Sequence, residues 1–229
     1  MDDPERMVAE PRAYADRMAG FRLLDLLVDR RVLIPRPETE GLVEHVLAWA
    51  GERWGNGTWG AALDLGTGSG CIALSLATEG RFARIVGTDV SAEALSVARA
   101  NVGRVRPERV PEFRWGDLFE AVAGERFDVI VSNPPYIAEP EYAALDPSVR
   151  DFEPREALVS GPDGLAHTRA ILERAGDHLM PGGLVALEVD SRRAEQSAGL
   201  AGAAGFEQVR VERDVFDRPR FLLVRKDRA

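Results

Sequence analysis

The sequence predicts an α/β fold with a doubly wound, mostly parallel seven-stranded sheet and an antiparallel C-terminal edge strand. Three observations support this prediction. From Gly60 onward, short apolar runs typical of buried strands alternate with segments of helical periodicity. Such alternation is typical of parallel sheets with helices on both faces. A glycine-rich turn joins the first strand to its helix, and two strand-like runs, at 206–211 and 221–224, close the chain as a hairpin.

The chain divides into two unequal parts. Residues 1–30 are mixed and charged, and we expect a short N-terminal linker segment with a short helix at 12–18 and a strand-like run at 23–28. Residues 31–229 are expected to form one domain. After Pro35 and Pro37, apolar residues recur at three- and four-residue spacing, which predicts a helix opening near Glu38.

The alternating region follows in order. Strands are expected at residues 61–65, 84–89, 113–115, 127–132 and 184–189, and helices at 71–77, 92–101, 165–179 and 194–204. Ser91 is predicted to cap the N-terminus of the helix at 92–101. Residues 181–183 are expected to form a turn. The proline-containing loop after the strand at 127–132 is longer than compact domains usually have without a functional reason.

Composition limits the possible functions. With 29 basic and 38 acidic residues the net charge is −9, which argues against extended nucleic-acid contact but leaves a local basic groove possible. Cys71 is the one cysteine, so no internal disulfide can form. No spacing of histidines with Cys71 suggests a metal site. No signal-peptide core or bilayer-length apolar run is present, so we expect a soluble, cytoplasmic protein without membrane contact.

The most informative motif is Asn133-Pro134-Pro135-Tyr136, directly after the predicted buried strand at 127–132. Ligands bind at such strand ends in open α/β sheets. Two successive prolines stiffen the backbone and remove two N–H donors, which leaves a turn rich in acceptors. The Asn133 side-chain oxygen and nearby main-chain carbonyls therefore suit a planar –NH2 group. An ordinary Asn-Pro turn leaving a strand is the alternative.

A second motif joins the first strand of the alternating region to its helix: Asp64-Leu65-Gly66-Thr67-Gly68-Ser69-Gly70. Its glycines allow a tight turn and close approach of a ligand to the backbone. The helix N-terminus behind them offers free N–H groups. The spacing differs from the Gly-x-Gly-x-x-Gly of dinucleotide binders. Asp64 is either a ligand contact or a structural anchor of the turn.

Acidic residues follow the next two strands. Asp89 ends the second strand, where a carboxylate can accept hydrogen bonds from both hydroxyls of a ribose. Asp117 follows the third strand and could accept from an adenine amino group, with Leu118 against the base. Each acid alone could be a solvated loop residue. Glu38 and Glu40 either interact with the helix dipole or line the mouth of the site.

Together these segments resemble the HemK family. Residues 32–40, 64–70 and 133–136 occur in the family's order, and Phe152-Glu153-Pro154, Ala157-Leu158 and Asp163-Gly164-Leu165 also match. The resemblance covers roughly residues 28–229. It implies a class I, Rossmann-like methyltransferase that uses S-adenosylmethionine to methylate the N5 amide of a glutamine in class-1 peptide chain release factors.

The resemblance also assigns roles to residues. Asp64, the Gly66 to Gly70 turn, Asp89, the Asp117-Leu118 corner and Asn133 would hold S-adenosylmethionine. Asn133 and Pro134 would be the catalytic residues that bind the substrate amide, with Pro135 and Tyr136 completing the substrate site.

Two departures from the family pattern stand out. The family usually carries a helical N-terminal domain that helps to recognise the release factor, so residues 1–30 are expected to be its remnant, and the mode of substrate docking stays open. In addition, Glu188-Val189-Asp190 replaces a glutamate followed by a glycine-containing turn.

Three other functions remain possible from the sequence. An N6-adenine nucleic-acid methyltransferase would present the same –NH2 group to the turn, although DNA methylation of this kind usually needs a basic face. A ribosomal-protein glutamine methyltransferase is closer still. The third is a cofactor-binding module without catalysis. The sequence does not indicate an oligomeric state.

Overall fold

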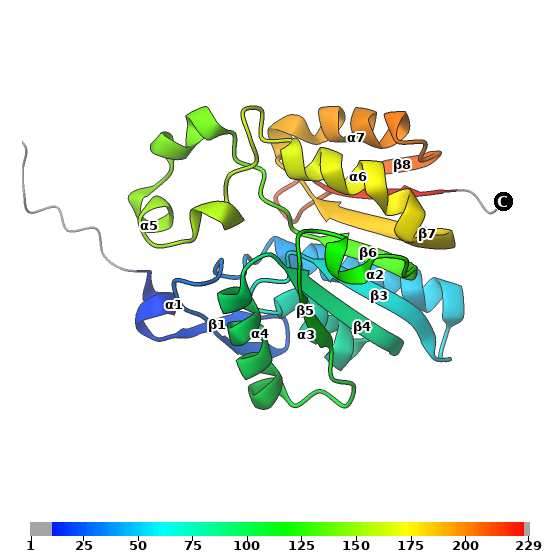
Figure 1. The fold of residues 1–229 in the computed structure, drawn as a ribbon, viewed down its shortest axis with the longest axis horizontal. Coiled ribbons are helices and arrows are strands. Elements are labelled where there is room, and N and C mark those ends of the chain that lie inside the picture. Colours follow the sequence, from blue (N-terminus) through cyan, green and yellow to red (C-terminus); the bar gives the residue numbers. More distant parts are fainter. Residues whose placement is uncertain (1–10, 227–229) are drawn as a thin grey trace, which may run out of the picture.

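The computed structural model describes residues 11–226 (Figure 1). Residues 1–10 of the expected N-terminal segment and 227–229 at the other end lie outside the described residues. The strands are β1 (Met18–Phe21), β2 (Leu24–Leu27), β3 (Trp59–Leu65), β4 (Phe82–Asp89), β5 (Glu112–Trp115), β6 (Phe127–Ser132), β7 (Leu179–Glu188), β8 (Gln208–Arg213) and β9 (Pro219–Arg225). The α-helices are α1 (Arg12–Ala15), α2 (Thr39–Trp54), α3 (Cys71–Glu79), α4 (Ala92–Val105), α5 (Pro147–Arg150), α6 (Ala166–His178) and α7 (Ala194–Ala203).

The main sheet has seven strands in the order β5-β4-β3-β6-β7-β9-β8. The strands from β5 to β7 pair in parallel, and β9 is antiparallel to both β7 and β8. The predicted mostly parallel seven-stranded sheet with antiparallel C-terminal strands is therefore confirmed. Within the closing hairpin, β9 lies inside the sheet and β8 forms its outer edge.

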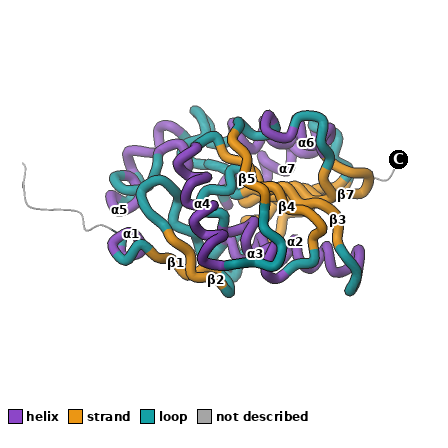
Figure 2. The backbone as a smooth tube through the Cα atoms, turned by 60° about the horizontal axis from the view of Figure 1, so that its bottom comes forward, coloured by secondary structure: helices purple, strands orange, loops and turns teal. Residues whose placement is uncertain are grey.

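Helices cover both faces of this sheet because the central strands are apolar on both sides. Val129 and Val131 of β6 pack into the core formed with α2 and α3, whereas Ile130 packs into the core formed with α6 and α7. Figures 1 and 2 show the resulting layers, with α6 and α7 on one side of the strands and α2 and α3 on the other. Between residues 11 and 226, no helix is long and apolar enough to span a bilayer.

Two sequence-based expectations are wrong in detail. The helix expected at 12–18 ends at Ala15, because Met18 already begins β1. The turn expected at 181–183 is part of β7, whose ladder with β6 shifts register between Phe127 and Val129. Gly182 has a φ of +69° there, a backbone conformation that glycine adopts without strain, so the strand bulges and continues.

The N-terminal strands form a hairpin that packs against α4 and α3. Asn101 of α4 is fully buried and holds this hairpin. Its side chain accepts a hydrogen bond from Leu27 N at 2.7 Å and donates to Leu27 O at 3.0 Å. It also donates to Ser69 O, in the glycine turn, at 2.9 Å. The hairpin and the turn therefore share one anchor. That residues 1–30 are the remnant of a recognition domain stays a prediction.

The long loop between β6 and α6 is structured. It contains the short helices η2 (Glu139–Ala144), α5 and η3 (Arg155–Ala157), and a bridge between Ile137 and Val159 closes its base. Glu141 of η2 forms ion pairs with Arg192 and Arg193, which follow β7. These ion pairs connect the loop to the segment after β7. In Figure 1 this loop stands at the carboxyl-terminal edge of the sheet.

Replacing the buried amide tests the shared anchor. We expect Asn101→Ala to lower the free energy of unfolding by about 2–4 kcal/mol, because three backbone groups lose their partner in a buried place. Urea unfolding of both proteins measures this difference. Asn56→Ala, in the exposed turn after α2, is the control and should change stability by less than about 0.5 kcal/mol. A similarly small effect at Asn101 would contradict the anchoring role.

Candidate active site

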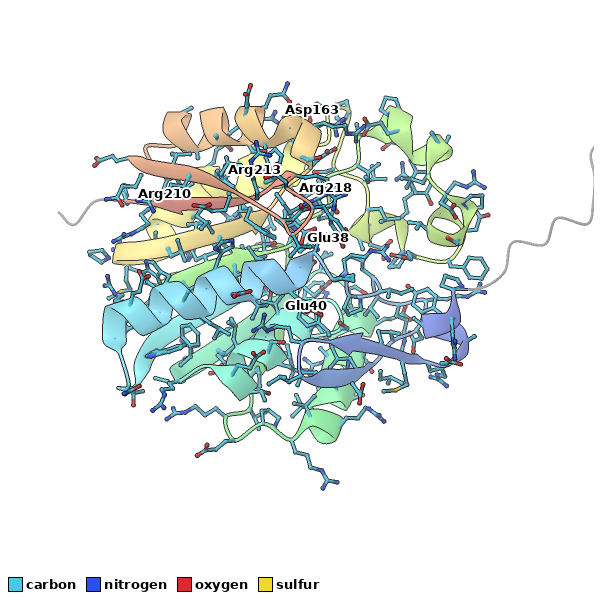
Figure 3. All side chains as sticks on the ribbon, turned by 180° about the vertical axis from the view of Figure 1, so that it is seen from behind. Glu38, Glu40, Asp163, Arg210, Arg213 and Arg218 are labelled. Atoms are coloured by element: carbon cyan, nitrogen blue, oxygen red, sulfur yellow. The ribbon has the colours of Figure 1, made fainter. Side chains whose placement is uncertain are left out.

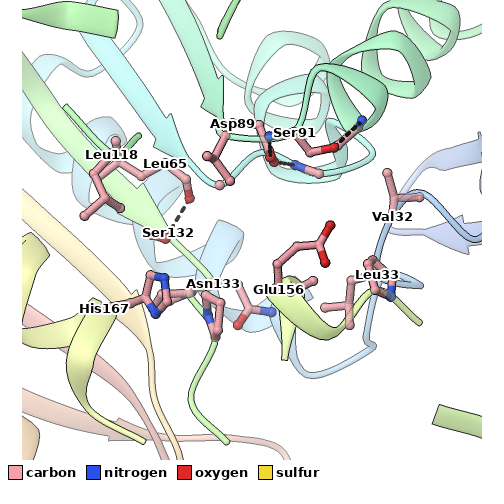
Figure 4. Close-up of a pocket in the computed structure, with 18 of the residues that line it drawn as sticks. Val32, Leu33, Leu65, Asp89, Ser91, Leu118, Ser132, Asn133, Glu156 and His167 are labelled. Carbon is pink, nitrogen blue, oxygen red and sulfur yellow. Dashed lines mark hydrogen bonds between the residues drawn. The ribbon is translucent and has the colours of Figure 1, made fainter. Parts of the chain in front are cut away.

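The parallel register brings the predicted site residues to one edge of the sheet. Leu65 of β3 lies level with Thr88 of β4 and with Ser132 of β6. The residues that follow these three are therefore neighbours, and they border a cavity (Figure 4). Ligands bind at this edge in open α/β sheets.

The glycine turn after β3 presents bare backbone to the cavity. Gly66 and Gly68 have φ values of +68° and +54°, and a Cβ added at either would meet no atom within 4 Å. Glycine is needed there for the backbone conformation, and its open side leaves room for a ligand. Gly70 differs, because an added Cβ would lie 3.2 Å from Phe113 and 3.3 Å from Ala98. It serves the packing of α3 against α4 and β5.

Asp64 lies under the turn and is fully buried. Its Oδ2 accepts hydrogen bonds from Thr67 Oγ1 at 2.6 Å and Ala73 N at 3.1 Å. Burial raises the pKa of Asp64 to about 7 against these two bonds, and its Oδ1 has no partner among the described residues. Asp64 does not line the cavity, so its contacts favour the anchoring interpretation.

Asp89 combines both roles. Its Oδ2 accepts from Gly68 N and its Oδ1 from Ser91 N, each at 2.9 Å. These bonds join the end of β4 to the glycine turn and to the start of α4. The side chain also lines the cavity, and burial raises its pKa. Ser91 caps α4 as predicted, through its Oγ and Ala94 N at 3.1 Å.

The third strand end forms the far wall. Asp117 and Leu118 both line the cavity, and Leu118 has a φ of +47°. Its carbonyl accepts a hydrogen bond from Thr88 Oγ1 at 3.2 Å, which holds this strained corner against β4. His167 of α6 lines the same wall, and burial lowers its pKa. His167 follows the matching segment Asp163-Gly164-Leu165 closely, but no role at the site was assigned to it from the sequence.

The Asn133 turn stands between two cavities. Asn133 and Pro134 line the first cavity together with Pro135, and they line a second cavity together with Tyr136. The Asn133 Nδ2 donates to Thr39 Oγ1 at 3.0 Å. Among the described residues, neither Asn133 Oδ1 nor the Pro134 carbonyl accepts a hydrogen bond. Two acceptors at this junction are therefore available to a ligand.

The second cavity is mainly apolar. It is lined by Leu33, Arg36, Asn133, Pro134, Tyr136, Ile137, Leu145, Val149, Ala157 and Leu158. Arg36 donates through one nitrogen to both oxygens of Glu153, at 2.6 and 2.8 Å, which joins the segment before α2 to the long loop. Burial raises the pKa of Glu153, while the Arg36 guanidinium acts to lower it.

Other residues predicted from the sequence lie outside the cavities. Glu38 pairs with Arg218 and Glu40 accepts a hydrogen bond from Arg22 N, so both tie the start of α2 to neighbouring segments. The glycine turn also contains Thr67, Ser69 and Gly70, but these three residues do not line the first cavity. The long loop adds cavity residues that reasoning from strand ends missed, among them Glu156, whose carboxylate extends into the open space in Figure 4.

The residues present fit S-adenosylmethionine. The first cavity opens to solvent, and the empty space in it and at its mouth amounts to about 790 Å³. Open glycine backbone, the Asp89 carboxylate and the apolar side chains of Leu118 and Val90 line it together. The glycine backbone matches the charged tail of S-adenosylmethionine, the Asp89 carboxylate matches its ribose, and the two apolar side chains match its base. Within residues 11–226, no group of three or more His, Cys, Asp or Glu side chains could hold a metal ion.

Solved structures share this fold. A methyltransferase from Pyrococcus furiosus matches with a TM-score of 0.64 and 23% identity, covering 89% of each chain. The T. thermophilus 16S rRNA N2 G1207 methyltransferase, in complex with AdoMet and guanosine, matches with a TM-score of 0.60 and 21% identity, covering 84% of this chain and 43% of that one. These matches confirm the class I, Rossmann-like methyltransferase fold.

Sequence relatives identify the family. A family model described as a methyltransferase small domain matches residues 50–146. The release factor glutamine methyltransferase of Cereibacter sphaeroides is 46% identical over 198 residues, which cover 86% of this chain and 68% of that protein. That of Geobacter sulfurreducens is 42% identical over 201 residues, which cover 88% and 68%. The chain spans about two thirds of the length of these relatives, and it belongs to the family of release factor glutamine methyltransferases.

Proposed function

We propose that this protein transfers a methyl group from S-adenosylmethionine to the N5 amide nitrogen of a glutamine in a protein, most specifically a class-1 peptide chain release factor. The observation that carries the proposal is the pair of acceptors at the junction of the two cavities. Asn133 Oδ1 and the Pro134 carbonyl, without partners among the described residues, match the two hydrogens of a primary amide. Membership in the family supports the same substrate class.

The chain's task is to make an unreactive nitrogen react. The lone pair of a carboxamide nitrogen is delocalised into its carbonyl, so the nitrogen is a poor nucleophile. If Asn133 Oδ1 and the Pro134 carbonyl accept its two hydrogens, the amide is held in one orientation. The two acceptors also stabilise the positive charge that grows on nitrogen, since this charge strengthens both hydrogen bonds in the transition state.

S-adenosylmethionine supplies, when bound, a methyl group on a positively charged sulfur. The amide nitrogen held by Asn133 and Pro134 would take that methyl group while the donor sulfur kept the bonding electron pair, and one of the two amide protons would leave to water. Asn133 and Pro134 border both cavities, so they hold the amide at the boundary with the donor side. Orientation of two reactants in this way can contribute roughly 7–11 kcal/mol to lowering a barrier.

On the donor side we assign three tasks to the chain. Gly66 and Gly68 let the tail of the donor approach the backbone, Asp89 accepts from the ribose hydroxyls, and the Asp117-Leu118 corner contacts the base. A substrate that acts in translation implies a cytoplasmic site of action. The net charge of −9 supports a protein substrate over extended nucleic-acid contact.

Labelled transfer tests the whole proposal. The protein is incubated with methyl-labelled S-adenosylmethionine and one candidate substrate at a time. The candidates are purified class-1 release factors, ribosomal proteins and nucleic acid. We expect label on the release factors, and mass spectrometry should place it on a glutamine side chain. Label confined to ribosomal proteins would reassign the substrate, and label on adenine would overturn the amide assignment. If the protein binds the donor but transfers no label to any of these substrates, the result would favour a cofactor-binding module without catalysis.

The amide-binding role of the turn is tested by Asn133→Ala. We expect kcat to fall by at least about 100-fold, because one of the two acceptors is lost. The affinity for S-adenosylmethionine, measured by calorimetry, should stay within about three-fold of the wild-type value, since the glycine turn, Asp89 and the Asp117-Leu118 corner are intact. Asn56→Ala, remote from both cavities, is the control. Wild-type turnover by Asn133→Ala would rule out the proposed acceptor.

The donor side is tested by Asp89→Ala. We expect the Kd for S-adenosylmethionine to rise by about ten-fold or more, equivalent to at least about 1.4 kcal/mol, because the ribose loses its acceptor and the glycine turn loses a support. Glu93→Ala is the matched control, because Glu93 is exposed in the first turn of α4 and lies outside the cavity. An equal Kd for Asp89→Ala and Glu93→Ala would show that Asp89 does not bind the donor.

A further inference from the structure

A chain of hydrogen bonds continues behind Asn133, away from both cavities. Asn133 Nδ2 donates to Thr39 Oγ1 at 3.0 Å, and Thr39 Oγ1 donates to Glu188 Oε2 at 2.7 Å. The Tyr136 hydroxyl approaches the other carboxylate oxygen of Glu188, at 3.4 Å. Thr39 and Glu188 are each only 1% exposed, so water does not compete for these bonds. Neither residue lines either of the two cavities described above.

The order of donors and acceptors in this chain decides which way the Asn133 amide points. A carboxylate oxygen can only accept, so the single hydroxyl hydrogen of Thr39 is directed to Glu188. The Thr39 oxygen can then only accept from Asn133, which must present its –NH2 group. Burial raises the pKa of Glu188, while the hydrogen bond from Thr39 and the nearby Arg220 guanidinium act to lower it.

Thr39 itself is held in place from two sides. It is the first residue of α2, and its N–H donates to Arg36 O at 3.0 Å. The residue before it, Glu38, pairs with Arg218 of the C-terminal hairpin at 3.0 Å, as Figure 3 shows from behind. The residue after it, Glu40, accepts from Arg22 N of the N-terminal hairpin at 2.9 Å. The hydroxyl is therefore presented to Asn133 by a fixed backbone.

We propose that Thr39, oriented by Glu188, is a positioning residue that keeps the Asn133 oxygen turned toward the substrate amide. A flipped Asn133 would offer hydrogens to the hydrogens of the substrate –NH2 group, which cannot pair. The hydroxyl of Thr39 thus makes the site select an amide nitrogen as its ligand. This inference rests on the proposed glutamine methylation. It assigns to the start of α2 the orientation of the Asn133 amide, which neither the helix dipole nor packing provides.

Two substitutions separate positioning from packing. Thr39→Val keeps the shape and removes the hydroxyl, whereas Thr39→Ser keeps the hydroxyl and removes a buried methyl group. We expect Thr39→Val to lower kcat by about 10- to 100-fold, because orientation of the acceptor is lost. Thr39→Ser should keep kcat within about three- to five-fold of wild type. The Kd for S-adenosylmethionine should change by less than about three-fold in both variants.

A role in packing alone predicts the opposite order, with Thr39→Ser the more damaging change and Thr39→Val close to wild type. Melting temperatures are recorded for both, so that loss of the fold is recognised. Thr168→Val is the control, because Thr168 in α6 is also 1% exposed and lines neither cavity. Its kcat should equal that of wild type.

The outcomes distinguish this inference from the proposed function. If the wild type methylates glutamine and Thr39→Val does so with the same kcat, the positioning role is wrong and the proposed function stands. If the wild type transfers no methyl group to any glutamine, the proposed function fails and the inference fails with it. If Thr39→Val methylates glutamine slowly and Thr39→Ser does so at nearly the wild-type kcat, both the proposed function and the positioning role of Thr39 are supported.

Discussion

The parallel register of the central strands is the constraint on which the rest of the structure depends. Ser132 lies level with Leu65 on one side and with Leu187 on the other. Asn133 therefore emerges between the glycine turn after β3 and Glu188 at the end of β7. A slip of one residue in any of these pairings would turn the side chains to the opposite face of the sheet. Asn133, the glycine turn and the residues whose hydrogen bonds orient Asn133 would then separate.

Buried acids hold this arrangement together. Asp64 supports the glycine turn, Glu153 pairs with Arg36, and Glu188 accepts from Thr39. Burial raises the pKa of each one, and hydrogen bonds act to lower it again, from the adjoining turn and helix for Asp64 and from distant segments for Glu153 and Glu188. The oxygens of these acids accept hydrogen bonds that hold Thr67, Arg36 and Thr39 in place. The groups that we propose to bind the substrate are an uncharged amide oxygen and a main-chain carbonyl of the Asn133 turn.

Local patterns predicted much of the fold and the strand-end part of the site. The expected strand at 127–132 coincides with β6, because a fully buried apolar run ends where two prolines prevent its continuation. Prediction failed where tertiary contacts override local signals, as at Gly182, whose turn-like sequence became a bulge inside β7. The cavity residues Glu156, in the long loop, and His167, just after it, were missed because only the folded loop brings them to the strand ends.

The sequence by itself determined the order of the main strands and helices, the family and the presence of a turn rich in hydrogen-bond acceptors after β6, because these depend on residues adjacent in the chain. Only the tertiary structure decided that Asp64 anchors the turn while Asp89 faces the cavity. It also decided the orientation of Asn133. That orientation depends on a hydrogen bond to Thr39, 94 positions away, and such a contact exists only once the sheet has set its register.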